Sequence, residues 1–400
     1  MTQLLFDASH TSHTRAQTGI QRLCRALHAA LRERVGDVLP ICHDPYESAW
    51  RPLQAWEREN MVPTRGALAG MRRARWPWHA IAAGWVRRLL ADRGGSSWRP
   101  ELQGSSFVEP EIFSPAVGLA LPGLLARVTG SRVVLFHDAT ALRLPELSPV
   151  KTVARYPAYM QDLLRFDGVA AISEESAAVL SGYWRWLGVD RPPPVIGLPL
   201  GIDAPEPSPY GHFIAPNAPL VVLSVGSIEG RKNHVALLDA CEMLWARGLR
   251  FELRLIGLSH PQTGRAALDR LRTLQIAGRP IHYSGAAPEP LLQEAYRSCA
   301  FTVYPSLMEG FGLPVLESLS HGKPCICSAQ GALGESARDG GCVMLDRTDA
   351  PALAEAISCL LGNSERLAAL AEVARQRKFK DWTTYADELL SWMKALPRRH

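Results

Sequence analysis

The sequence predicts an α/β protein with two domains, each built on a parallel sheet. Its 400 residues are more than one hydrophobic core usually serves. Short apolar runs alternate with helical patterns along the chain, which is typical of parallel sheets with crossover helices. Nine prolines gather between residues 191 and 219, and this shift in composition indicates a linker between the two domains.

The elements before the linker follow from apolar spacing. Apolar residues three or four apart predict a helix from Ile20 to about Arg34, and Ser173 is placed to cap a later helix. Residues 50–105 are hard to assign, and residues 40–125 show no pattern that gives them a role. The strands expected in this half are residues 3–6, 133–136 and 168–172.

A second set of alternating strands and helices starts after the linker. Ligands of such sheets bind beyond the carboxyl ends of the strands, so the residues that follow each strand are the candidates for chemistry. A helix is expected at 234–247, and strands at 220–225, 251–256, 281–284, 300–305, 324–328 and 342–345.

Composition narrows the class of protein. A net charge of +5, with 47% hydrophobic and 21% charged residues, gives no argument for a nucleic-acid partner. Residues 1–7 lack a basic region and a long apolar core, so we expect no signal peptide, and no apolar run has the length of a membrane span. The eight cysteines form no CxxC pair, and Cys325 and Cys327 would share one face of a strand without bridging. We therefore expect reduced thiols and a cytoplasmic protein.

A turn between two glutamates, residues 309–317, carries the clearest chemical signal. It follows an apolar run that indicates a buried strand, and Pro314 suits the start of the helix after it. A strand, a loop with glycines and a helix N-terminus form an anion site, because backbone amides and the helix dipole point at the loop. The carboxylates of Glu309 and Glu317 suit hydroxyl groups. Phosphate beside a polyhydroxyl compound describes a nucleotide sugar.

Two adjacent cations, Arg231 and Lys232, follow the strand at 220–225 and a loop that begins at Gly226. At a strand end they would neutralise a diphosphate, since Arg offers a fork of donors and Lys a point charge. The alternative is a solvated helix start, because surface cations are common.

The first half offers a histidine at a strand end. His137 would hydrogen-bond a sugar hydroxyl or the acceptor, and Asp138 would orient the imidazole or act on the acceptor; the alternative is a structural histidine. Gly19, at the start of the first long helix, would let backbone amides approach a phosphate. The sequence has no Asp-x-Asp and no His/Cys cluster with ligand spacing, so we expect no metal site.

Residues 71–90 hold five arginines, three tryptophans and no acidic residue. That mixture suits the headgroup region of an anionic membrane, and a peripheral contact with the inner membrane is one interpretation. The other is an excursion that packs on the first domain or shapes the acceptor site, since Pro77 and Gly84 weaken a continuous amphipathic helix.

Taken together, these motifs resemble the retaining glycosyltransferases of family 4, which have the GT-B fold. Gly226, Arg231-Lys232-Asn233 and the Glu309-x7-Glu317 spacing carry the resemblance in the second half. In the first half, residues 18–22 and 136–138 resemble the N-terminal motifs of bacterial mannosyl- and rhamnosyltransferases of that family. One departure is that Ser227 and Ile228 stand where family members often carry another basic residue.

The resemblance implies two Rossmann-like domains and a role for each motif. Residues 1–204 would form the acceptor-side domain, residues 205–383 the donor-binding domain, and a helix over residues 384–400 would cross back to the first. In the second half, the implied donor contacts are Arg231 and Lys232 on the diphosphate, Glu317 on the ribose, and Glu309 with the amides of Gly310, Phe311, Gly312 and Leu313 on sugar and phosphate. Gly226 and Gly285 would lie in donor loops. In the first half, Gly19 would lie near the diphosphate, and His137 with Asp138 at the sugar site.

The resulting hypothesis is metal-independent transfer of a hexose from a nucleoside diphosphate sugar, with retention, to a glycan or lipid-linked acceptor of bacterial surface polysaccharide, such as lipopolysaccharide. GDP-mannose is the favoured donor, with GDP- or dTDP-rhamnose next, and no further cofactor is expected. Three alternatives remain at this point: a nucleotide-sugar epimerase, a glycogen-phosphorylase-like enzyme, and a non-catalytic scaffold of the same fold.

Overall fold

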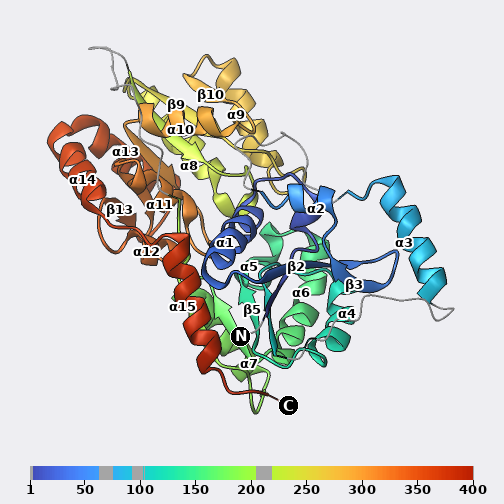
Figure 1. The fold of residues 1–400 in the computed structure, drawn as a ribbon. Helices are drawn as coiled ribbons and strands as arrows, with labels where there is room; N and C mark the ends of the chain where they lie inside the picture. Colours follow the sequence, from blue (N-terminus) through green and yellow to red (C-terminus); the bar gives the residue numbers. More distant parts are fainter. Residues whose placement is uncertain (1–2, 63–74, 92–101, 103, 204–218, 400) are drawn as a thin grey trace. The chain divides into compact units, whose positions relative to one another are not determined.

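The structure is a computed structural model that describes residues 3–62, 75–91, 102, 104–203 and 219–399 (Figure 1). The chain divides into two compact units. The first comprises Met1–Asp138, Arg155–Gly201 and Trp382–His400, and the second comprises Ala139–Ala154 and Ile202–Asp381. The predicted boundary between residues 204 and 205 lies outside the described residues. The segment Ala139–Ala154, which the prediction placed in the first domain, groups with the second unit.

The first unit is built on a seven-stranded sheet of order β3-β2-β1-β4-β5-β6-β7. Its pairs are parallel except β2 with β3, which a four-residue loop joins, too short for a crossover connection. The strands are β1 Gln3–Asp7, β2 Val38–Asp44, β3 Ala49–Pro52, β4 Ser105–Glu109, β5 Arg132–Phe136, β6 Gly168–Ala171 and β7 Val195–Gly197. The helices are η1 Thr11–His13, α1 Gly19–Val35, α2 Ala55–Glu59, α3 Trp78–Ala91, α4 Pro115–Leu125, α6 Val150–Asp162, η3 Leu163–Arg165, α7 Glu174–Trp186 and α15 Trp382–Ala395. The boundary between the units falls within α6, whose residues up to Ala154 group with the second unit.

The second unit is a six-stranded sheet of order β10-β9-β8-β11-β12-β13, and all its pairs are parallel. The strands are β8 Leu220–Val225, β9 Phe251–Ile256, β10 Ile281–Tyr283, β11 Phe301–Tyr304, β12 Cys325–Ser328 and β13 Cys342–Leu345. The helices are α5 Thr140–Arg143, η2 Pro145–Leu147, η4 Gly230–Lys232, α8 His234–Ala246, α9 Arg265–Ile276, α10 Glu289–Ser298, α11 Leu313–Ser320, α12 Gly331–Ala337, α13 Ala350–Gly362 and α14 Ser364–Gln376.

The last helix, α15, packs within the first unit beside α1 (Figure 1). Arg34 of α1 lies 2.8 Å from Asp387 of α15, and the Ser131 hydroxyl donates to the Met393 carbonyl at 2.6 Å. Gly168 at the start of β6 leaves room for this helix, because a Cβ there would come within 2.7 Å of the Trp392 ring. A glycine at this strand start is therefore a packing requirement.

Several local features that the sequence predicts are present in the structure. The Ser173 hydroxyl accepts from the Ser176 amide and caps α7. All eight cysteines are free thiols, and Cys325 and Cys327 are both buried on β12. Among the described residues, no helix is both long enough and apolar enough to cross a bilayer. The elements between residues 38 and 125 were not predicted, since β2 contains a proline and ends in polar residues, and β3 has only four residues.

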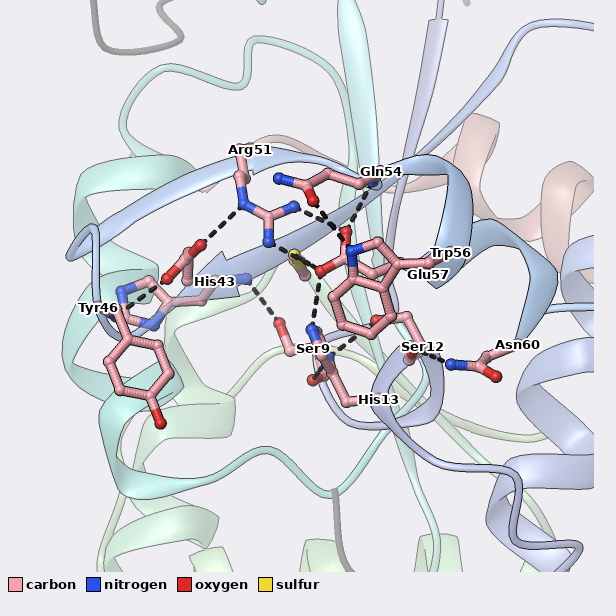
Figure 2. A network of polar contacts seen from close by, with 12 residues as sticks. Ser9, Ser12, His13, His43, Tyr46, Arg51, Gln54, Trp56, Glu57 and Asn60 are labelled. Carbon is pink, nitrogen blue, oxygen red and sulfur yellow. Dashed lines mark hydrogen bonds and ion pairs between the residues drawn. The ribbon is translucent and has the colours of Figure 1, made fainter. Parts of the chain in front are cut away.

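A buried polar network joins η1 to the hairpin β2–β3 and to α2 (Figure 2). Glu57 receives two bonds from the Arg51 guanidinium, at 2.7 and 2.8 Å, and His13 Nε2 lies 2.8 Å from the same carboxylate. The Nε of the same guanidinium donates to the Asp44 carboxylate at 2.9 Å. Burial raises the pKa of Glu57, but the bonds from Arg51 and His13 outweigh it and lower that pKa to about 2. The network therefore fixes the loop after β1.

Candidate functional site

Three glycines at the carboxyl ends of β8, β9 and β10 shape one wall of the predicted donor site. Gly226 and Gly257 have φ of 152° and 151°, and Gly285 has φ of 62°. The chain passes so closely here that a Cβ on Gly257 would lie 1.9 Å from the Gly226 carbonyl oxygen. Backbone bonds link the three loops: Gly226 donates to Ile256 at 2.8 Å and Gly257 to Gly285 at 2.7 Å. Gly257 was not predicted as a site residue.

The two predicted cations meet the first predicted carboxylate. Arg231 Nη1 lies 2.6 Å from Glu309 Oε2, and the Lys232 ammonium donates to Glu309 Oε1. The guanidinium also donates to the Met308 carbonyl at 3.1 Å and approaches Glu229 at 2.9 Å. Lys232 is buried, and Arg231 and Glu309 are half-buried. These cations are therefore part of an organised cluster rather than a freely solvated helix start.

Glu309 is held ionised by this arrangement. Burial raises the pKa of its carboxyl. The charges of Arg231 and Lys232 and their hydrogen bonds outweigh this effect and lower the pKa to about 2. His234 lies nearby, and burial together with the Lys232 charge lowers its pKa to about 4. At neutral pH the cluster thus contains a carboxylate, two cations and a neutral imidazole.

The loop after β11 is tied to the cation loop and then enters α11. The Leu307 amide donates to the Arg231 carbonyl at 2.8 Å, so the two loops are joined through backbone as well as side chains. Gly312 caps α11 with φ of 104°, and the Ser336 hydroxyl donates to the Phe311 carbonyl at 2.7 Å. Any Cβ at Gly312 would approach Ser336 Oγ to 2.9 Å. The predicted helix N-terminus is present, with Pro314 in its first turn.

Glu317, the second predicted carboxylate, lies one turn into α11 and is half-buried. Its Oε2 accepts from the Tyr296 hydroxyl at 3.0 Å, and that hydroxyl lies 3.0 Å from the Tyr304 hydroxyl. The ring of His321 stacks on Tyr296 with centroids 4.8 Å apart. Tyr296 and Tyr304 orient Glu317, and neither was predicted. A tyrosine before a strand and one at its end gave no recognisable motif.

The predicted residues of the first half belong to the first unit. His137 follows β5 and is buried, and its Nε2–H donates to the Pro110 carbonyl at 2.8 Å, which leaves Nδ1 as the acceptor of the neutral ring. Burial lowers the pKa of His137. The Asp138 carbonyl accepts from the Tyr156 hydroxyl. Gly19 is exposed at the N-terminus of α1, where the Thr18 side chain makes no cap bond. Their roles toward a ligand stay predictions.

Two groups of side chains in the described part of the chain have the composition of a metal site. One is Cys325, Cys327 and Cys342, whose sulfur atoms lie within 4.8 Å of one another on β12 and β13. The other is His13, Cys42 and Glu57, where both Glu57 oxygens already accept from Arg51. The second group is therefore explained as an ion-paired network. The expectation of metal-independent chemistry stays a prediction.

A carboxyl pair that was not predicted lies at the ends of the adjacent strands β1 and β4. Asp7 and Glu109 are fully buried and share a hydrogen bond, which requires that one of them carries a proton. Burial raises the pKa of Asp7 to about 6, and burial with the neighbouring Asp7 charge raises the pKa of Glu109 well above its usual value. A single acid after a strand gives no signal of such a pair.

This pair makes the first unit more stable at low pH. Both pKa values are raised in the folded state, so the stabilisation is complete below the unfolded pKa values, roughly 4, and is lost as pH rises through about 6 and above. We expect Glu109→Gln to raise Tm at pH 8 and to flatten the Tm–pH profile between pH 5 and 8. Glu294→Gln, an exposed acid, is the control. An unchanged wild-type slope in Glu109→Gln would contradict the assignment.

Known proteins resemble this chain in sequence and in fold. Residues 213–377 match the family described as "Glycosyl transferases group 1". The chain is 34% identical over 179 residues to the O-antigen chain mannosyltransferase B of Escherichia coli, covering 44% of this chain and 45% of that protein. It is 32% identical over 280 residues to the D-inositol 3-phosphate glycosyltransferase of Nocardia farcinica, covering 65% and 60%. The chain spans about half the length of these relatives.

Solved structures share the whole fold at low sequence identity. Sucrose-phosphate synthase from Thermosynechococcus elongatus superposes with a TM-score of 0.66 at 17% identity, covering 99% of both chains. WaaG, a glycosyltransferase involved in lipopolysaccharide biosynthesis, gives 0.59 at 15%, covering 98% of this chain and 99% of that one. The predicted GT-B fold, with two parallel-sheet α/β units, is thus confirmed. Residues 213–377, which hold the Arg231–Lys232–Glu309 cluster, are the part of the chain that is similar to the glycosyl transferases group 1 family.

Proposed function

We propose that the protein transfers a hexose from a nucleoside diphosphate sugar, with retention of anomeric configuration, to a sugar hydroxyl of a lipid-linked or oligosaccharide acceptor. The observation that carries the proposal is the cluster of Arg231, Lys232 and Glu309 beside the N-terminus of α11. It combines two cations, a helix dipole and an ionised carboxylate, which are the groups that a diphosphate and sugar hydroxyls require.

Without donor, Glu309 occupies the cations that a diphosphate would need. Arg231 and Lys232 both contact its carboxylate, so a bound diphosphate would compete with Glu309 for them. We infer that the diphosphate takes over the cations, and that the freed Glu309 carboxylate then accepts hydroxyls of the donor sugar. Glu317, oriented by Tyr296, is left to accept the ribose hydroxyls.

The leaving diphosphate gathers negative charge in the transition state. Preorganised donors aimed at that charge accelerate the reaction, and here they are Arg231, Lys232 and the first amides of α11. No carboxylate is assigned as a nucleophile, so the proposal follows a front-face path in which the leaving phosphate takes the acceptor proton. His137, with Nδ1 as acceptor, is proposed to contact the sugar, and Asp138 the acceptor. The protein cations take the place of a metal.

The donor and pathway are proposed from similarity. The similarity to the O-antigen chain mannosyltransferase B of Escherichia coli supports mannose as the transferred sugar. GDP-mannose is the donor that we propose, with GDP- or dTDP-rhamnose next. The same similarity supports an acceptor in bacterial surface polysaccharide synthesis. With eight free thiols, the protein is proposed to act in the cytoplasm, on the inner face of the inner membrane.

A thermal-shift panel tests the donor class. A ligand that binds the native state stabilises it by about 2.7 kcal/mol at a hundred times its Kd, so a true donor should raise Tm by several degrees. We expect GDP-mannose and GDP to raise Tm more than GMP or guanosine does, because the cluster recognises the second phosphate. UDP- and dTDP-sugars are included in the panel to test which nucleobase the site prefers. If no nucleoside diphosphate or nucleotide sugar raises Tm, the proposal fails.

A further inference from the structure

Helix α3 carries an apolar stripe that faces solvent. Its large apolar side chains are strongly exposed: Trp78 81%, Trp85 50%, Val86 55%, Leu89 58% and Leu90 53%. Their spacing of three and four residues places them along one side of the helix. We call these five residues the α3 stripe. A helix of a globular protein normally buries its apolar side against the core, whereas the apolar side of α3 faces solvent.

The opposite side of α3 is the side that packs on the unit. Ala80 is 1% exposed, and a Cβ on Gly84 would lie 2.8 Å from the Tyr46 Cβ. Gly84 therefore permits close docking, although it was predicted to weaken the helix. Arg87, also on this side, donates to Glu47 at 2.6 Å. The helix is thus held in place by its small residues and by the ion pairs of Arg87, and the outward direction of the stripe follows from that docking.

The charges beside the stripe select its partner. Arg75, Arg87 and Arg88 lie in residues 75–91, and this segment has no acidic residue. Arg87 is neutralised by Glu47 and Asp44, whereas Arg75 and Arg88 are exposed, and the Arg88 guanidinium lies 5.8 Å from the Trp85 ring centre. Apolar and indole side chains flanked by cations match the boundary between acyl chains and anionic headgroups.

A second copy of the chain fits this surface less well. A two-fold interface through the α3 stripe would bring the same arginines of two molecules together, and like charges facing each other oppose association. The helix has 14 residues and a length of ~21 Å, shorter than the ~30 Å hydrocarbon core, so it suits lying along a bilayer rather than crossing it.

We propose that the α3 stripe docks the first unit onto the anionic surface of a lipid bilayer, with the helix axis along the membrane plane. The inference deepens the proposed function and rests on it in one respect, that a lipid-linked acceptor is presented at such a surface. For residues 75–90, the part of 71–90 that the structure describes, both interpretations then hold together: α3 packs on the unit by one side and offers the other to lipid, while residues 71–74 lie outside the described residues.

Vesicle co-sedimentation tests the docking. Wild-type protein should sediment with phosphatidylcholine vesicles that contain about one third phosphatidylglycerol, and much less with phosphatidylcholine alone or at high salt. Trp85→Ser/Leu89→Ser should lower the partition coefficient at least tenfold, and Arg88→Gln should lower it severalfold on anionic vesicles only. The matched control, Trp186→Ser/Ile276→Ser, removes a tryptophan and an aliphatic residue elsewhere that are more exposed, at 79% and 89%, and should bind as wild type does.

The outcomes separate docking from catalysis. Unchanged vesicle binding by Trp85→Ser/Leu89→Ser, or no binding by the wild type, would overturn the docking. So would a dimer in light scattering that this variant abolishes, because the occupant would then be a second copy. The variant should keep the Tm rise with nucleoside diphosphate. If nucleoside diphosphate raises the Tm of neither the wild type nor any variant, while the wild type still binds vesicles, the proposed function is overturned and the docking stands.

Discussion

Replacing Lys232 by methionine is expected to lower kcat by roughly 10²- to 10³-fold, which corresponds to about 2.7–4 kcal/mol of transition-state stabilisation. The ammonium is buried against Glu309 beside the N-terminus of α11, where water screens it poorly. Methionine keeps most of the length of the side chain but lacks the positive charge and the hydrogen-bond donors of the ammonium. The rate should be measured with saturating donor, so that weaker binding does not mask the effect on the chemical step.

A matched variant distinguishes the loss of a cation at the site from the loss of a cation elsewhere on the protein. Lys394→Met removes an exposed cation at the end of α15 and should leave kcat unchanged. Full activity of Lys232→Met at saturating donor would show that this cation does not stabilise the leaving diphosphate.

The second large effect is expected on stability, from Glu57→Gln. Glu57 is fully buried, and its replacement leaves the buried Arg51 guanidinium without its bidentate partner. Removing one partner of a buried ion pair typically costs about 3–5 kcal/mol, so the free energy of unfolding of the first unit should fall by that order. Urea unfolding of the full chain, monitored by far-UV circular dichroism, measures the change. Glu59→Gln, an exposed glutamate on the same helix, is the control and should change it little.

Two further measurements identify the cause as the ion pair. The pKa of Glu57 is lowered to about 2, so its contribution is complete above the unfolded pKa, roughly 4.3, and should disappear as pH falls toward 2. The triple variant Asp44→Asn/Arg51→Met/Glu57→Met removes the guanidinium together with both carboxylates that it bonds, and it should be more stable than Glu57→Gln. If the triple variant is the less stable of the two, shape rather than an unpaired charge explains the loss.

The sequence allowed the second sheet to be predicted more fully than the first. Residues 220–225 form a nearly continuous apolar run and residues 251–256 alternate apolar with charged positions, and both patterns are typical of strands. The predicted bounds agree with β8 and β9. In contrast, β2 contains Pro40 and ends in His43 and Asp44, so no apolar run marks it. Those polar residues fit because the chain places charged partners around them, which local patterns do not show.

The site was predictable in its residues but not in its pairings. Glu309, Arg231 and Lys232 were each found from their positions after strands, whereas their mutual ion pairs depend on two loops that the fold brings together. The contact of Tyr296 with Glu317 depends on α10 packing beside β8, which no motif encodes. The shared proton of Asp7 and Glu109 was missed because their strands are separated by about a hundred residues of chain.

Calorimetric titration with the nucleoside diphosphate that raises Tm most is the direct test of the donor site. The wild type should bind it at least tenfold more tightly than the monophosphate. Lys232→Met should lose this preference, and Glu309→Gln should keep or strengthen it, because the cations no longer have an internal anion to exchange. Equal affinity of Lys232→Met and wild type for the diphosphate would contradict the assignment of this cluster as the site of a nucleotide sugar.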